Sequence, residues 1–202
     1  MPKSTFFRIS EEKRKRVIVA AQNEFFSHSY NEVSINQIIK NAKIPRGSFY
    51  QYFEDKEDLF LHVVQEQKKI IQEEFVKGME KNGGDLFACV DYFAELFFES
   101  VYMNRRGIYN IISAPPLDFD KFWGFGFVED CSDECVFKRY VNTQTITVSS
   151  EEEVEAFINI FAAIVRDTIS KVNIIKNDED LDRVKKSFMG QIKSLENHYK
   201  KG

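Results

Sequence analysis

The sequence has few of the residues that interrupt or cross-link a chain. Its 202 residues include only four prolines, nine glycines and three cysteines, while 43% of them are hydrophobic. Disordered proteins are poor in hydrophobic residues, so that class is excluded. A chain of this length and composition can bury a substantial core, and we expect one or two ordered domains.

Long apolar runs are also missing. A membrane-spanning helix needs about 18 or more consecutive apolar residues, but the most apolar stretch, residues 86–102, is interrupted by Asp91, Glu95 and Glu99. No apolar segment precedes the charged run EEKRKR near the N-terminus, so a secretory signal is not expected. We therefore expect a cytoplasmic protein with no membrane partner.

The three cysteines cannot form a disulfide framework, and their odd number favours reduced thiols. Cys131 and Cys135 are four residues apart, a spacing that leaves a metal or redox pair as an alternative. No histidine lies near them to complete a zinc site, because the three histidines are His28, His62 and His198. We expect buried or half-buried free thiols, and we predict no metal and no cofactor.

Charge is unevenly distributed along the chain, whose net charge is −4. Residues 1–56 contain ten lysines and arginines against six aspartates and glutamates, a net charge of +4. The remaining residues contain 18 basic and 26 acidic side chains, a net charge of −8. A basic head on an acidic body is typical of a nucleic-acid-binding domain joined to one that does not touch nucleic acid.

Residues 34–56, SINQIIKNAKIPRGSFYQYFEDK, predict two short helices joined by a tight turn. Ser34 and Gln37 have the spacing of a capping box, in which each side chain binds the backbone amide of the other residue. Pro45 is suited to the start of the second helix because its missing N–H would be unpaired there. Phe49 and Phe53 supply the inner face of this helix. The side chains left to point elsewhere are those of Arg46, Ser48, Tyr50 and Gln51.

A short helix with an apolar back and a polar front, set after a capped helix, suits insertion into a DNA major groove. The run PRGSFYQYFEDKEDLF resembles the signature of the TetR family of bacterial helix-turn-helix transcriptional regulators, and the resemblance covers about residues 10–60. Pro45 stands where that family usually has a polar residue. A helical hairpin whose aromatic rings merely pack together is the alternative.

The resemblance implies which residues meet DNA. Ser34, Tyr50 and Lys56 match family positions that touch phosphates, and we expect Arg46 to contact a base. The predicted DNA-binding set is completed by Ser48 and Gln51.

A further helix is expected ahead of this motif, over about residues 10–27, with Ser10 as its N-cap. The basic run KRKR at 13–16 falls in its opening turns, and we expect Lys3 and Arg8 to lie in an arm before it. Such charges usually face solvent. Beside a DNA-reading helix they are suited to phosphates or, in the arm, to a minor groove.

The body is expected to be helical. Asp55 is a candidate N-cap for a long helix that the sequence Asn-Gly-Gly ends at residues 82–84, and residues 85–114 predict two helices with a break near 104–107. Residues 141–149 are β-branched and uncharged, which favours a loop or an extended segment. Two long helices follow, and we expect Ser149 or Ser150 to cap the first and Asn177 the second.

These two terminal helices either close the monomer or form half of a four-helix dimer interface. We expect the dimer, because a helix-turn-helix protein reads two half-sites. Phe161 and Phe188 are the residues that we place in its seam.

Aromatic residues gather between positions 86 and 127, where 12 of 42 residues are Phe, Tyr or Trp. Such rings either fill a core or line a cavity, and Gly124 and Gly126, set between large rings, favour a cavity. The resemblance implies that this region holds an effector, and we expect a small apolar or aromatic molecule. Asn110 or Arg106 is expected at its polar end, and the predicted lining residues are Phe93, Phe97, Tyr109 and Trp123.

The sequence thus predicts an all-α fold in which a three-helix helix-turn-helix head, residues 1–56, joins a helical effector-binding and dimerisation body, residues 57–202. The expected function is that of a ligand-responsive homodimeric repressor, released by its effector from a palindromic double-stranded DNA operator. A constitutive DNA-binding regulator with a packed body is the alternative. An enzyme using Tyr109 or His62 is not expected, because no nucleophile–base pair, metal set or phosphate loop is visible.

Overall fold

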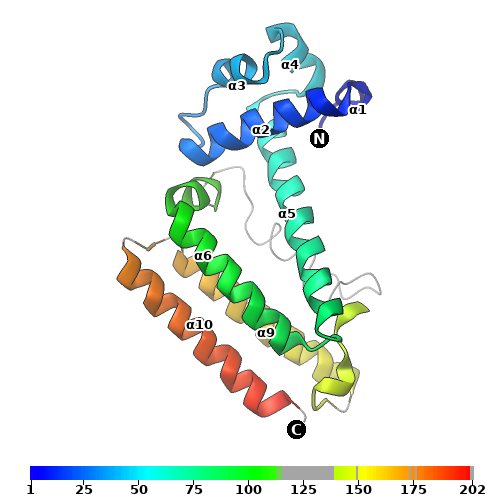
Figure 1. Cartoon of the computed structure of the whole chain (residues 1–202), viewed down its shortest axis with the longest axis vertical. Helices are drawn as coiled ribbons and strands as arrows, with labels where there is room; N and C mark the ends of the chain where they lie inside the picture. Colours follow the sequence, from blue (N-terminus) through cyan, green and yellow to red (C-terminus); the bar gives the residue numbers. More distant parts are fainter. Residues whose placement is uncertain (113, 115–138, 149, 173, 176, 201–202) are drawn as a thin grey trace. The chain divides into compact units, whose positions relative to one another are not determined.

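The structure is a computed structural model that describes residues 1–112, 114, 139–148, 150–172, 174–175 and 177–200. Over these residues it contains eight α-helices and one short 3-10 helix, which confirms the predicted all-α fold (Figure 1). The chain divides into two compact units. Unit 1 comprises residues 1–70 and 104–117, and unit 2 comprises residues 71–103 and 118–202.

Unit 1 contains four short helices and parts of two long ones. These are α1 (Ser4–Arg8), α2 (Glu11–Ser27), α3 (Ile35–Ala42), α4 (Arg46–Tyr52), the beginning of α5 (Lys56–Lys81) and the end of α6 (Leu86–Ile112). The predicted helices of the head are confirmed as α2, α3 and α4. The arm expected ahead of them is wrong, because residues 4–8 form α1 with the ring of Phe6 buried.

The core of unit 1 is built from the apolar faces that the sequence pattern defines. Phe49 and Phe53 are both completely buried, as expected. Burying a side chain of this size stabilises a fold by roughly 1.5–3 kcal/mol, so a seven-residue helix such as α4 persists through its packing and not through its own hydrogen bonds. The other fully buried side chains of unit 1 include Val17, Ala21, Ile38, Leu59, Phe60 and Val63.

The starts of α2 and α5 follow the local capping patterns. The hydroxyl of Ser10 accepts from the amide of Lys13 at 3.4 Å, and the carboxylate of Asp55 accepts from the amide of Asp58 at 2.8 Å. The capping box of α3 is only half formed. Ser34 Oγ accepts from the amide of Gln37 at 3.3 Å, but the Gln37 side chain donates to Asn41 Oδ1 at 3.0 Å and does not reach back.

Unit 2 contains the rest of α5 and α6, a 3-10 helix at Thr143–Thr145, α9 (Glu151–Val172) and α10 (Asp178–Tyr199). The expected break inside α6 falls at Asn104, whose φ of −141° and ψ of 47° are not helical. The Asn-Gly-Gly stop after α5 is confirmed, because Gly83 and Gly84 both have positive φ values. Gly84 is irreplaceable for a second reason, since a Cβ there would lie 2.7 Å from the backbone nitrogen of Asn142.

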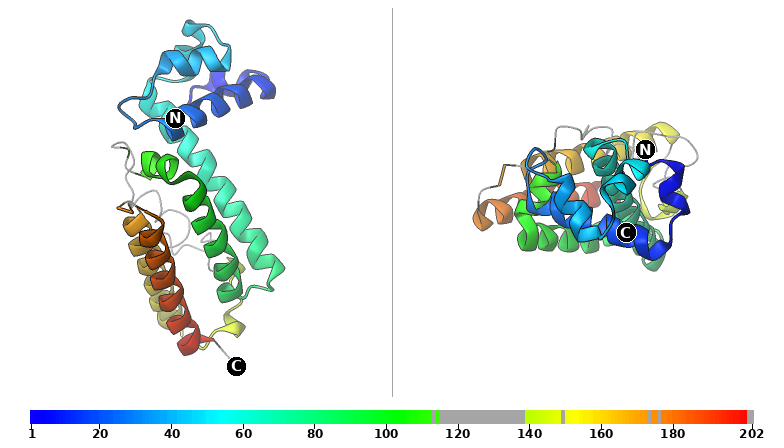
Figure 2. Two further views of the ribbon diagram at one scale, coloured as in Figure 1. Left: turned by 60° about the vertical axis from the view of Figure 1, so that its left-hand side comes forward. Right: turned by 90° about the horizontal axis from the view of Figure 1, so that it is seen from above.

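The helices α9 and α10 run side by side (Figure 2). Their expected caps are present: Ser150 Oγ accepts from the amide of Glu153 at 3.3 Å, and Asn177 Oδ1 accepts from the amide of Asp180 at 2.8 Å. Phe157 of α9 contacts both neighbouring helices, with its ring centroid 4.8 Å from that of Tyr199 in α10 and 6.1 Å from that of Phe87 in α6. None of the helices in the described part of the chain is long and apolar enough to cross a membrane.

Candidate nucleic-acid interface

The turn between α3 and α4 depends on one left-handed residue. Lys43 has a φ of 54° and a ψ of 49°, a conformation that a residue with a Cβ adopts only at a cost. It allows the amide of Ile44 to donate to the carbonyl of Ile39 at 3.2 Å, so that α3 ends abruptly. Pro45 then occupies the N-cap of α4 in an extended conformation, without a side-chain cap.

The helix α4 has an anchored face and an open face. Phe49 and Tyr52 are buried, whereas the side chains of Arg46, Tyr50 and Gln51 are exposed. Ser48 lies between the two faces and is half-buried. A guanidinium, a phenol and an amide on one short, anchored helix are suited to reading base edges and phosphates.

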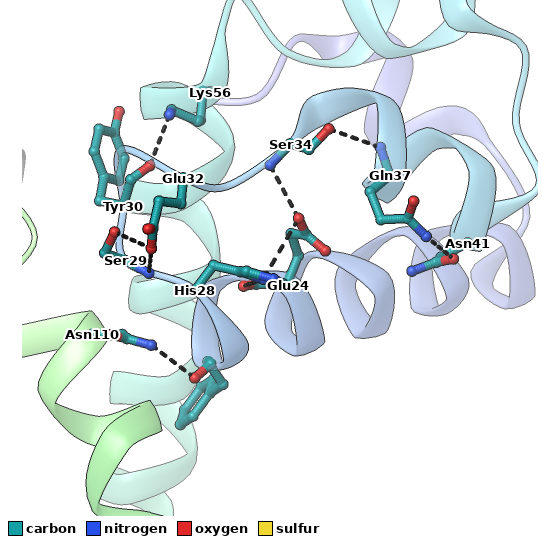
Figure 3. Close-up of polar contacts among 11 residues, drawn as sticks. Glu24, His28, Ser29, Tyr30, Glu32, Ser34, Gln37, Asn41, Lys56 and Asn110 are labelled. Atoms are coloured by element: carbon teal, nitrogen blue, oxygen red, sulfur yellow. Dashed lines mark hydrogen bonds and ion pairs between the residues drawn. The ribbon is translucent and has the colours of Figure 1, made fainter.

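Ser34, at the start of α3, is held by a buried carboxylate. Its backbone amide donates to Glu24 Oε1 at 3.0 Å, and Glu24, in α2, is only 6% exposed (Figure 3). His28, the C-cap residue of α2, places Nδ1 3.7 Å from the same carboxylate oxygen. The Ser34 hydroxyl is already engaged as the cap of α3, but a hydroxyl can donate and accept at once.

Lys56, at the start of α5, is also engaged within the protein. Its ammonium donates to the carbonyl of Tyr30 at 2.7 Å and lies 4.5 Å from the centroid of the Tyr30 ring (Figure 3). An ammonium has three donors. The bond to Tyr30 therefore fixes the position of the charge and leaves donors for a phosphate.

The four basic residues at the start of α2 differ in their contacts. Arg14 donates to the carbonyl of Phe7 at 3.1 Å, and Arg16 pairs with Glu12 at 2.6 Å. Lys13 lies 5.6 Å from the ring centroid of Tyr52, and Lys15 is exposed.

The N-terminal residues do not form the arm that we expected for a minor groove. Lys3 donates through its ammonium to the carbonyl of Tyr50 at 3.0 Å and through its backbone amide to the carbonyl of Tyr52 at 2.8 Å. Phe6, 1% exposed, lies against Phe53 and Tyr52. These contacts draw the segment onto the end of α4, while Arg8 forms the last residue of α1.

The end of α6 also belongs to unit 1. The side-chain amide of Asn110, 6% exposed, donates to the carbonyl of Phe26 at 3.0 Å (Figure 3). Asn110 thus supplies a donor to the C-terminal end of α2, where carbonyls lose their helical partners. This bond engages the amide that we had expected at the polar end of an effector.

Two of the four predicted effector-lining residues lie outside what can be described. Trp123 lies outside the described residues, as do Gly124 and Gly126, and the Tyr109 side chain is likewise not described. Phe93 is half-buried, with its ring centroid 5.5 Å from that of Phe75. Phe97 is half-buried, with its centroid 5.3 Å from that of Phe98.

Cys89 is a buried thiol at the contact between α6 and α5. Its Sγ lies 3.7 Å from the carbonyl of Phe75, and burial raises the pKa of the Cys89 thiol to about 11. The thiol is therefore protonated and unreactive near neutral pH. Cys131 and Cys135 lie outside the described residues, over which no group of three or more His, Cys, Asp and Glu side chains could hold a metal ion.

The geometry of α2, α3 and α4 is that of a helix-turn-helix domain. The model of bacterial regulatory proteins of the tetR family matches residues 17–63, which include α3, α4 and the start of α5. The N-terminal domain of this chain belongs to the tetR family.

The relatives that match in sequence do so mainly over this domain. YdgC of Bacillus subtilis, described as an uncharacterized HTH-type transcriptional regulator, is 38% identical over 53 residues, 26% of this chain and 27% of YdgC. The HTH-type transcriptional regulator EthR of Mycolicibacterium smegmatis is 26% identical over 117 residues, 56% of this chain and 53% of EthR. The chain thus spans about half or less of the length of these curated relatives.

Solved structures share the fold over most of the chain. A transcriptional regulator from Cytophaga hutchinsonii superposes with a TM-score of 0.67 at 18% identity, covering 95% of this chain and all of that one. The regulatory protein TetR from Rhodobacter sphaeroides superposes with a TM-score of 0.58 at 16% identity, covering 88% of this chain and 97% of that one. At these identities the likeness establishes the fold.

Sequence reasoning missed the contacts that hold the reading helices in place. Glu24 is only one of six acidic residues in a basic head, and no pattern in the sequence singles out Tyr30. The partners of Glu24 and Lys56 lie ten and 26 residues away along the chain. The one local signal is the position of Glu24 in the last turns of α2. A carboxylate there interacts unfavourably with the helix dipole, which indicates that a specific partner stabilises it.

Proposed function

We propose that this chain is a homodimeric DNA-binding transcriptional regulator that acts as a repressor and leaves a palindromic operator when a small apolar or aromatic effector binds. In this proposal residues 1–56 bind DNA and residues 57–202 bind the effector and dimerise, in the cytoplasm. The observation that carries it is the open face of α4, where Arg46, Tyr50 and Gln51 are exposed on a helix whose other face is buried.

The head would read DNA by placing α4 in the major groove. A guanidinium can bind two acceptors of guanine at once, so Arg46 is assigned a base contact, with Ser48 and Gln51 beside it. Ser34, Tyr50 and Lys56 are assigned to phosphates, which fix the register. The net +4 of residues 1–56 would draw the head to DNA and make its affinity depend on salt.

Dimerisation is assigned to the outer faces of α9 and α10. Phe161 and Phe188, which we had placed in the seam, are 6% and 7% exposed within the single chain and therefore close the monomer. Ile160 is 43% exposed, Ala163 is exposed, and a Cβ at Gly190 would meet no atom within 4 Å. Small and apolar residues on two adjacent helices suit a four-helix interface with a second copy.

The effector is assigned to the aromatic segment around Phe93, Phe97, Tyr109 and Trp123. To act as an inducer it must bind the DNA-incompetent arrangement more tightly, since equal affinity for both states shifts nothing. Both α5 and α6 contribute residues to unit 1 and to unit 2, so a change in either helix would reach the head. The Asn110–Phe26 hydrogen bond supports α6 as one such route.

The test begins with selection of a duplex from a random DNA pool by the intact protein. We expect a palindromic sequence with half-sites about 34–36 Å apart or somewhat more, bound by two copies in sedimentation experiments. Lipophilic and aromatic compounds are then titrated while the fluorescence of Trp123, the single tryptophan, and operator release are followed together. Selection of no sequence would refute DNA reading. Selection without release by any compound would favour the constitutive regulator.

A further inference from the structure

The last turn of α4 leaves carbonyl groups that its own helix cannot satisfy. An α-helix has no internal partners for its last four carbonyls. In α4 the carbonyl of Phe49 accepts from the amide of Phe53 at 2.9 Å, which closes the helix. The next three carbonyls, those of Tyr50, Gln51 and Tyr52, point beyond the end of the helix.

All three of these carbonyls are bound by the N-terminal segment. The Lys3 ammonium donates to the Tyr50 carbonyl at 3.0 Å, and the Lys3 backbone amide donates to the Tyr52 carbonyl at 2.8 Å. The Thr5 hydroxyl donates to the Gln51 carbonyl. Two residues, 46 and 47 positions earlier in the chain, therefore supply the C-terminal cap of the helix.

The segment is anchored by one ring. Phe6 is 1% exposed, and its centroid lies 4.8 Å from that of Phe53 and 5.5 Å from that of His62. The ring thus packs on both sides of the junction between α4 and α5. The positive charge of Lys3 also lies at the negative end of the α4 dipole, where a cation is favourable.

We propose that Lys3 and Thr5 are positioning residues that set the orientation of α4 for DNA reading and do not touch DNA themselves. The inference rests on the proposed function. Tyr50 and Gln51 would present their side chains to DNA while their own carbonyls are held from behind by residues 3 and 5. A seven-residue helix cannot hold its last turn alone. Loss of these bonds therefore loosens Tyr50, assigned to a phosphate, and Gln51, assigned beside the base contact, while the rest of the fold persists.

The test compares Thr5→Val with Ser4→Ala in the full-length protein. Valine keeps the shape of threonine and removes the hydroxyl, whereas Ser4, exposed in the same turn, serves as the matched control. Fluorescence anisotropy would measure affinity for the duplex selected by the wild type and for a random duplex of equal length. We expect Thr5→Val to lower the ratio of specific to random affinity about three- to tenfold, and Ser4→Ala to leave it unchanged.

A merely structural role would give a different result. If Thr5 only stabilised the fold, Thr5→Val would lower Tm and reduce both affinities in proportion, with the ratio unchanged. That outcome overturns the proposal. Failure of the wild type to prefer any duplex would instead overturn the proposed function, so the two failures are distinguishable.

Lys3→Met separates positioning from direct contact with DNA. If Lys3 caps α4, the variant lowers the specificity ratio, and the slope of log affinity against log salt stays that of the wild type. If Lys3 binds a phosphate, the slope falls by about 0.9 and both duplexes are weakened alike. This second pattern overturns the assignment of Lys3.

Discussion

The backbone amide of Ser34 donates to the buried carboxylate of Glu24 at 3.0 Å. This bond joins the end of α2 to the N-cap of α3, so the residue that starts the helix-turn-helix is fixed from two sides. The Ser34 hydroxyl caps α3 from within, and Glu24 holds the backbone from α2. The placement of α3 thus depends on a carboxylate that lies outside the motif.

Glu24→Ala should lower the free energy of unfolding by roughly 1–3 kcal/mol, because it leaves the Ser34 amide without its acceptor. Glu24→Gln keeps an oxygen at the same place and should cost less. Urea unfolding followed by circular dichroism measures both. Glu12→Ala is the control, since Glu12 is 83% exposed and its pair with Arg16 contributes little. Equal losses for Glu12→Ala and Glu24→Ala would contradict the role assigned to Glu24.

Arg46→Ala and Lys56→Ala should weaken DNA binding in different ways. Loss of a base contact at Arg46 should cost about 1–3 kcal/mol on the selected duplex and relax the choice of sequence. Loss of a phosphate contact at Lys56 should weaken all duplexes alike and reduce the salt slope by about 1. Lys193→Ala, which removes an exposed charge in unit 2, is the control. If both head variants lost affinity equally on specific and random DNA, the assignment of Arg46 to a base and Lys56 to a phosphate would be wrong.

His62 should make the stability of the protein depend on pH. It is 8% exposed among the rings of Phe6, Phe7 and Phe53. Burial lowers the pKa of His62 below 6.5, with Lys69 and the N-terminal amine acting in the same direction and Glu66 and Asp58 opposing them. The unfolded chain then takes up a proton more readily than the folded one, so stability is lost as the pH falls through about 6.5 towards the folded pKa.

The measurement is urea unfolding between pH 7.5 and 5.5. We expect His62→Gln to flatten the fall in stability that the wild type shows over this range. Because other groups titrate in both proteins, the contribution of His62 is given by the difference between the stability–pH curves of the wild type and the variant. Identical pH profiles would exclude His62 as the source.

Charges placed on two faces of the terminal helices should have different effects. Phe188→Glu should destabilise the single chain, because the ring is buried and its centroid lies 6.0 Å from that of Phe98. Ile160→Glu should leave the chain folded and split the proposed dimer. Ile174→Glu is the matched control, since Ile174 is 75% exposed in the turn after α9. An intact Ile160→Glu dimer in sedimentation would exclude the outer face of α9 from the interface.

Local patterns predicted the helices because their causes are local. A cap such as Asn177 binds an amide three residues ahead, and the break at Asn104 lies where a helical pattern ends. The outward set Arg46, Tyr50 and Gln51 follows from the same periodicity that buries Phe49. These features need no knowledge of distant residues, so the sequence was sufficient for them.

The remaining contacts depend on residues that are far apart in the chain. A five-residue helix such as α1 has too few positions to show a period, and it forms because Phe6 reaches the ring of Phe53. Asn110 binds a carbonyl 84 residues away, and nothing in its neighbourhood indicates that partner. Phe188 fits a seam pattern equally well in a monomer and in a dimer, so its periodicity did not decide between them.

The burial of Cys89 makes this thiol a probe of local opening in unit 2. The Cys89 thiol is protonated and lies against Gly78, 3.0 Å from the place where a Cβ would be. An alkylating reagent can reach it only when α6 separates from α5 at this point. The rate of Cys89 modification therefore measures how often unit 2 opens locally while the rest of the chain stays native. Mass spectrometry of the intact protein and its peptides would follow this rate.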